Sequence, residues 1–167
     1  MQGFESHAEL SLMAEPQGDH PRRGHEDCVD RWLDRSVDHD SSLELARLLS
    51  RTTDALWECA VTALGTVTLT AVVSRVFHRA ETQYPFLSKA HGKTAAHRIE
   101  PERIAAVPAA QLIEGMRFVL VELLAVIGRL TAEILTTELH AALQQVTPAA
   151  VPERQLRNAA SVSEKVS

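Results

Sequence analysis

The sequence predicts an all-α protein: a helical bundle of three to four helices with one long C-terminal helix, between an acidic N-terminal arm and a short tail. Two observations support this. Apolar residues recur in steps of three and four through most of positions 42–146, which is the period of an α-helix. The chain is also 45% hydrophobic but only 4% aromatic, so its core must be built from aliphatic side chains, which pack well between helices.

The chain divides into an arm (1–40), a bundle domain (41–147) and a tail (148–167). Its 167 residues suffice for one domain. The arm holds ten acidic and four basic residues, a net charge of −6, whereas the remaining residues hold 12 acidic and 13 basic ones. We expect the arm to be largely disordered up to residue 25, and the tail to be disordered, because both collect Gly, Pro, Ser and charge without a sustained apolar period.

A short amphipathic helix is expected within the arm at 26–37. Val29, Trp32, Leu33 and Val37 recur at helical spacing, with Asp and Arg on the other face. A helix this short is marginal alone and must dock on something. It either caps the core of its own bundle or lies in a groove on another protein, with Trp32 as the anchor. These four residues are therefore the predicted partner-docking site.

Two helices follow with clear boundaries. The first is expected at 42–64, where Ser41 and Glu44 fit a capping box and Gly65 is suited to the C-cap. The second is expected at 66–83, capped by Thr66 or Thr68, because a lone strand over its β-branched start would have no partner.

The crossover after Pro85 is expected to be a loop with a short helix at 101–106. Leu87, Ile99 and Ile104 are its apolar side chains, and we expect them to hold it against the bundle.

The dominant predicted element is a helix over about 108–146, from Pro108 to the residues before Pro148. Around its middle almost every position except Glu122 is apolar, and such a helix is buried on most sides. Two shorter helices cover about half of it, so the rest requires a second chain or the docked arm; a break at Gly115 or Gly128 is the alternative to one continuous helix. The predicted homodimer contact consists of the apolar side chains along this segment: Met116, Val119, Leu120, Leu123, Ile127, Leu130 and Ile134.

No residue pattern points to catalysis, a metal or a cofactor. His20, His25 and Cys28, with His39 beyond them, are zinc-ligand types, but their spacing matches no closed zinc site. No serine or cysteine has a visible base beside it, so we expect a non-enzymatic protein. Cys28 and Cys59 make no disulfide framework, which favours a reducing, cytoplasmic location.

The leading hypothesis is a protein–protein interaction module, acting as a regulator, adaptor or assembly factor. A net charge of −5 argues against nucleic-acid binding, and the longest apolar run is too short to span a membrane. One alternative is a sensor of an apolar ligand or haem, with Glu122 or Arg129 as the polar contact of a pocket and His78 or His140 as a haem ligand. A second alternative is a phosphorelay intermediate that uses His78.

Overall fold

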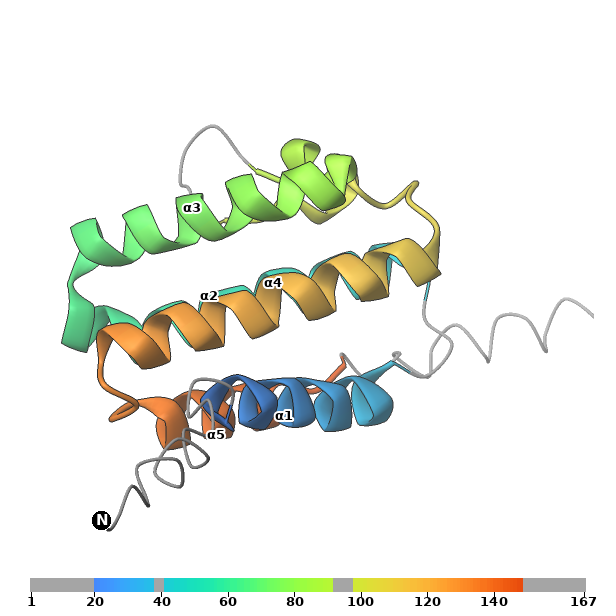
Figure 1. Cartoon of the computed structure of the whole chain (residues 1–167). Coiled ribbons are helices and arrows are strands. Elements are labelled where there is room, and N and C mark those ends of the chain that lie inside the picture. Colours follow the sequence, from blue (N-terminus) through green and yellow to red (C-terminus); the bar gives the residue numbers. More distant parts are fainter. Residues whose placement is uncertain (1–19, 38–40, 92–97, 149–167) are drawn as a thin grey trace, which may run out of the picture.

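A computed structural model describes residues 20–37, 41–91 and 98–148, and these residues form an all-helical fold (Figure 1). These ranges contain five α-helices, one within the predicted arm and four within the predicted bundle domain. In chain order the elements are α1 (His20–Ser36), α2 (Ser42–Leu64), α3 (Thr66–Gln83), the 3₁₀ helices η1 (Pro85–Lys89) and η2 (Pro101–Arg103), α4 (Ala109–Leu130) and α5 (Thr136–Gln145). The predicted disorder of 1–19 and 149–167 lies outside the described residues.

The predicted bounds of α2 and α3 are confirmed. The backbone N–H of Glu44 donates to Ser41 Oγ at 3.3 Å, as a capping serine requires. Gly65, at φ 75°, donates its N–H to Val61 and ends α2. The predicted cap of α3 by Thr66 or Thr68 is wrong, because Gly65 also serves as the N-cap of α3, with no side-chain cap bond.

The prediction of one continuous helix over 108–146 is also wrong. The chain reverses after α4, and α5 runs back beneath it beside α1 (Figure 1). Ala132 and Glu133 have positive φ values of 49° and 61°, and the Glu133 N–H donates to the Gly128 carbonyl at 2.7 Å. A Cβ at Gly128 would lie 2.7 Å from a carboxylate oxygen of Glu133, so the glycine makes room for this turn. The break thus follows Gly128, whereas Gly115 lies inside α4.

Helix α1 begins at His20, six residues before the predicted start, and packs against α4 and α5. The crossover holds to the body as predicted, since Leu87, Ile99 and Ile104 are buried. The expected helix at 101–106 is only the short 3₁₀ helix η2, followed by a turn.

Helix α4 is the axis of the fold. Helices α1, α2 and α3 pack along it and α5 meets it near its end, so its apolar side chains lie within one shared core. The core side chains of α4 are almost entirely aliphatic, as the composition predicts: Leu112, Met116, Val119, Leu120, Leu123, Leu124 and Ile127. Among the described residues, no helix combines the length and apolarity needed to cross a membrane.

Two glycines inside helices predict opposite effects of the same substitution. A Cβ at Gly115 would lie 2.7 Å from the Phe86 ring, whereas a Cβ at Gly24 meets nothing within 4 Å. We expect Gly115→Ala to lower the free energy of unfolding by roughly 1–3 kcal/mol through overpacking. Gly24→Ala should raise it by about 0.5–1 kcal/mol through helix propensity. Urea unfolding measures both, and a Gly115→Ala variant as stable as Gly24→Ala contradicts the packing described here.

Candidate functional site

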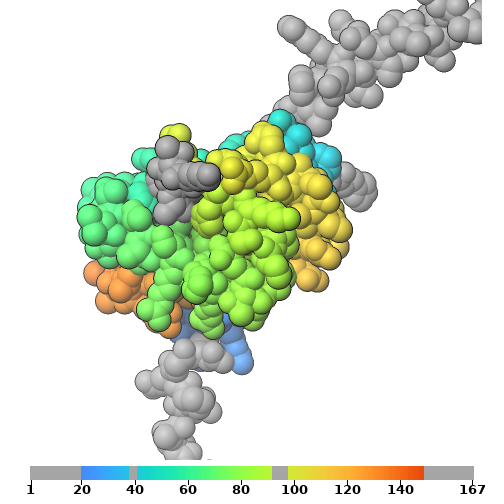
Figure 2. Space-filling view, turned by 90° about the horizontal axis from the view of Figure 1, so that it is seen from above, coloured from blue at the N-terminus to red at the C-terminus, as the bar shows by residue number. Residues whose placement is uncertain are grey.

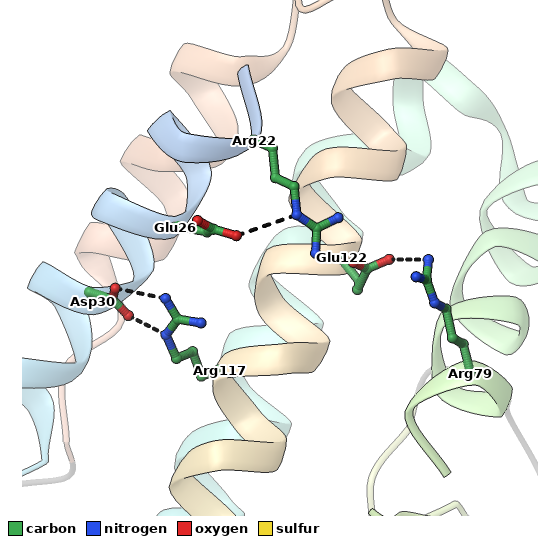
Figure 3. Close-up of polar contacts among 6 residues, drawn as sticks. All are labelled: Arg22, Glu26, Asp30, Arg79, Arg117 and Glu122. Carbon is green, nitrogen blue, oxygen red and sulfur yellow. Dashed lines mark hydrogen bonds and ion pairs between the residues drawn. The ribbon is translucent and has the colours of Figure 1, made fainter. Parts of the chain in front are cut away.

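The most deeply buried carboxylate of the described residues is Glu122, in the middle of α4. Glu122 is only 1% exposed. One oxygen accepts a hydrogen bond from Arg22 Nη2 at 2.6 Å, and the other accepts one from Arg79 Nη1 at 2.9 Å. Figure 3 shows the two guanidinium groups approaching from α1 and α3, on opposite sides. The two arginines supply the charge and the hydrogen bonds that a buried carboxylate needs.

Two further ion pairs lie on α1. Arg22 also contacts Glu26 at 3.3 Å, and its pKa is raised, first by the hydrogen bond to Glu122. Asp30 accepts two hydrogen bonds from Arg117 on α4, at 2.6 and 2.9 Å, which lower the pKa of its carboxyl group. Because Asp30 and Arg117 are nearly half exposed, their pairing contributes little stability but fixes how α1 lies on α4.

A pair of histidines joins α1 to α5. His25 Nδ1 lies 2.9 Å from His140 Nε2, and the rings meet edge to face. His25 is 1% exposed, and its Nε2 has no hydrogen-bond partner but lies 3.6 Å from a carboxylate oxygen of Glu133. Burial lowers the pKa of both rings; nearby cations add to the effect, while Glu133 opposes it. The pair is therefore held in a predominantly neutral form.

Beside this pair, residues of α1 and α5 line an open cleft of about 500 Å³. Gln144 reaches across it from α5 and places its amide nitrogen 3.4 Å from Cys28 Sγ. The lining side chains are largely polar: Cys28, Arg31, Asp34, Arg35, His140, Ala141 and Gln144.

The predicted docking residues of the arm face the core of the same chain. Val29 is fully buried, and Trp32 and Leu33 are 1% and 6% exposed, while Val37 packs half-buried at the edge. The Trp32 indole also donates to the Val146 carbonyl at 2.9 Å. In this conformation the groove that receives α1 is intramolecular, so these side chains offer no surface to another protein.

The predicted self-association surface is likewise mostly covered. Five of its residues, Met116, Val119, Leu120, Leu123 and Ile127, are at most 1% exposed because α1, α2, α3 and α5 cover α4. They cannot meet a second chain while the bundle is closed. Leu130 and Ile134 remain exposed, by 53% and 76%.

The polar residues considered for sensing and catalysis have structural surroundings. Both oxygens of Glu122 are engaged by arginines, and Arg129 lies exposed at the end of α4. Burial raises the pKa of Cys59, which disfavours its nucleophilic thiolate. The part of the chain that the structure describes contains no group of three metal-ligating side chains arranged to hold an ion.

We compared the chain with known proteins. No protein-family model, curated protein or solved structure matches it.

Sequence reasoning missed the histidine pair and the arginine contacts of Glu122. His25 and His140 are 115 positions apart, and each looks like an isolated histidine in its own helix. Glu122 did stand out, as the one charge in an apolar segment, but its arginine partners lie 100 and 43 positions away. Only the packing of the helices brings these groups together.

The geometry of Glu122 predicts non-additive substitutions. Replacing Arg22 or Arg79 alone by Met leaves the carboxylate one partner. Replacing both leaves a buried charge unpaired and should cost about 3 kcal/mol or more in the free energy of unfolding, beyond the sum of the single effects. Adding Glu122→Leu to the double variant should restore most of that loss, because it removes the unpaired charge. Urea unfolding tests this, and additive single effects without rescue would refute a buried ion-pair cluster.

Proposed function

We propose that the protein is a non-catalytic helical interaction module that self-associates through one end of its bundle. The large hydrophobic side chains exposed among the described residues are Val67, Leu130 and Ile134, at 86%, 53% and 76%. Val67 lies in the first turn of α3, Leu130 is the last residue of α4, and Ile134 lies in the turn between α4 and α5. Figures 1 and 2 place these two turns beside each other at the same end of the molecule. We call these three residues the end patch.

The end patch supports an interaction surface because its members come from two neighbouring turns. Single exposed apolar residues are ordinary on protein surfaces, whereas a group at one place favours contact with another molecule. Each side chain contributes about 1.5–3 kcal/mol when fully buried. One copy of the patch therefore supplies about 4.5–9 kcal/mol gross, in the lower part of the range of about 4–15 kcal/mol or more that association costs in entropy.

A second copy of the chain is the occupant that fits this patch best. In a two-fold contact the same surface meets itself, and six apolar side chains are buried instead of three. Their gross contribution of about 9–18 kcal/mol reaches the range of the association cost, so we expect a weak or moderate homodimer. Of the residues predicted from the sequence for self-association, the proposed contact therefore includes Leu130 and Ile134 but not the five that are buried.

We propose that another protein docks by placing a helix in a groove, as α1 does within the chain. Val29, Trp32 and Leu33 fill a groove on α4 and α5 as the apolar face of an amphipathic helix. A partner helix with a similar apolar face would compete with α1 for this groove. The acidic residues of the arm favour a partner with basic flanks.

A phosphorelay role for His78 is the second candidate, and one observation favours it. The His78 side chain is 90% exposed on α3, and its Nδ1 lies 3.9 Å from a carboxylate oxygen of Glu81. A histidine that accepts a phosphate group must be accessible in this way to the phosphate donor. Incubation with phosphoramidate, which phosphorylates histidine directly, should then give an acid-labile phosphate that His78→Gln abolishes. No incorporation, or the same incorporation in His78→Gln, removes this candidate.

The end patch predicts a specific loss of self-association. The double substitution Leu130→Lys and Ile134→Lys places like charges at the centre of the proposed contact and should weaken the dimer at least about tenfold, by sedimentation equilibrium. The fold should be retained, with stability changed by no more than about 0.5 kcal/mol, because both side chains are exposed.

Gln111→Lys is the control, since it adds one positive charge of the same kind at an exposed position at the other end of α4. It should dimerise like the parent protein. A parent that stays monomeric at all accessible concentrations, or a double variant that dimerises as tightly as Gln111→Lys, overturns the proposed function.

A further inference from the structure

The contact between α1 and α5 contains a group that changes charge near neutral pH. His25 and His140 come from the two helices and meet at 2.9 Å inside the seam. Histidine is the side chain whose charge ordinarily changes between about pH 5 and 8. The other contacts that hold α1 are apolar packing, an indole hydrogen bond and ion pairs of carboxylates with arginines.

The hydrogen bond between the two rings limits how many protons the pair can hold. One nitrogen must donate and the other must accept. This is possible when both rings are neutral, or when one of them is charged. When both rings are charged, Nδ1 of His25 and Nε2 of His140 both carry hydrogen, so the bond is lost and two cations face each other in a buried seam.

The charged groups around the pair make protonation of one ring less costly than protonation of both rings. Glu133, in the α4–α5 turn, lies 3.6 Å from the otherwise unpartnered Nε2 of His25 and can accept a hydrogen bond from it. The facing cations are Arg22 on the side of His25 and Arg31 on the side of His140. Asp34 and Arg35 line the adjoining cleft with His140 and offset each other in charge. Arg22 is already paired with Glu122 and Glu26, so the close charges that remain around the two rings are those of Glu133 and Arg31.

We propose that α1 is an acid-released latch, in which protonation of the His25–His140 pair detaches α1 from α4 and α5. Release exposes the apolar face of α1, including Val29, Trp32 and Leu33. It also exposes the surfaces of α4 and α5 on which α1 packs. An intramolecular contact thus becomes two complementary surfaces available to a partner helix.

The direction of the pH effect follows from the histidines. Their pKa values in the closed form are lowered below the ordinary value of 6.5. Above about pH 6.5 neither the open nor the closed form binds these protons, so docking is at full strength. As the pH falls below that value, the two histidines are protonated in the open form before they are protonated in the closed form, and docking of α1 weakens. This weakening ends once the pH is below the lowered pKa values of the closed form. Each proton taken up on opening changes the opening equilibrium by up to about tenfold per pH unit.

The remaining polar contacts do not respond in this window. The pKa of Asp30 is lowered by Arg117, and Arg22 and Arg117 have pKa values raised by their carboxylate partners. The Asp30–Arg117 pair is therefore lost only below the ordinary titration range of aspartate, near about pH 3.8. Between about pH 7.5 and pH 5 the histidine pair is the part of this contact that changes.

Trp32 reports the position of α1 directly, because it is 1% exposed when α1 is docked. The chain has two tryptophans, so the full-length Trp57→Phe variant leaves Trp32 as the sole emitter. We expect acrylamide quenching of Trp32 to increase several-fold between about pH 7.5 and pH 5. Far-UV circular dichroism should lose no more helix than α1 contains. Unchanged quenching over this range overturns the proposal.

Matched histidine variants, made in the same Trp57→Phe background, assign the effect. His25→Gln with His140→Gln removes both titrating rings and should abolish the pH dependence, whereas His78→Gln removes an exposed histidine on α3 and should preserve it. An undiminished pH response in the double glutamine variant refutes the latch.

If a variant already has α1 open at about pH 7.5, the quenching experiment has no closed state to compare with. Ring nitrogen chemical shifts of the histidines in the unaltered protein then test the latch. The latch requires His25 and His140 to titrate in the pH range in which Trp32 becomes exposed, and titration outside that range contradicts it. Neither experiment involves the end patch, so the latch and the proposed self-association succeed or fail separately.

Discussion

The exclusion of water from α4 is the constraint on which the rest of the fold depends. Val119, Leu120 and Val121 follow one another around its axis at about 100° per residue, and all three are at most 3% exposed. A helix that is apolar on nearly all sides needs neighbours on nearly all sides. The α2–α3 hairpin supplies part of this cover, and α1 and α5 supply most of the remainder. The arm and the reversed end of the chain are therefore structural parts of the core.

Glu122 interrupts the apolar surface of α4 and selects where its neighbours lie. Its two oxygens require two donors, and the guanidinium groups that meet this requirement come from α1 and α3. A buried ion pair often adds little net stability compared with an apolar side chain, because its groups lose their hydration. The hypothesis consistent with this cost is that Glu122 contributes specificity: of the ways in which α1 and α3 could slide along an aliphatic helix, it favours the one that brings both arginines to the carboxylate.

The sequence predicts the fold best where a boundary has local chemistry. The bounds of α2 and α3 follow from the Ser41 cap and from Gly65, and both helices occur as predicted. The end of α4 has no such signal, because the apolar period of α4 continues into α5 through Leu139 and Leu143, and a reversal in direction leaves periodicity unchanged. The same limit applies to the candidate sites. Spacing identifies the apolar face of α1 but does not distinguish its own core from a partner's groove, and no local pattern pairs His25 with His140.

The closed form exposes different kinds of surface at different places, and this restricts the two interactions that the sequence predicted for the arm helix and for the long C-terminal helix. The apolar side chains of α4 are unavailable while α1 is docked, so contact between closed copies is restricted to the end patch around the α2–α3 and α4–α5 turns. In the proposed latch, contact through the groove requires α1 to leave, and it therefore depends on the charge of the histidine pair. Because Val67, Leu130 and Ile134 remain exposed while α1 is docked, release of α1 does not create their surface. Self-association and groove binding can accordingly vary independently, the first with protein concentration and the second with pH.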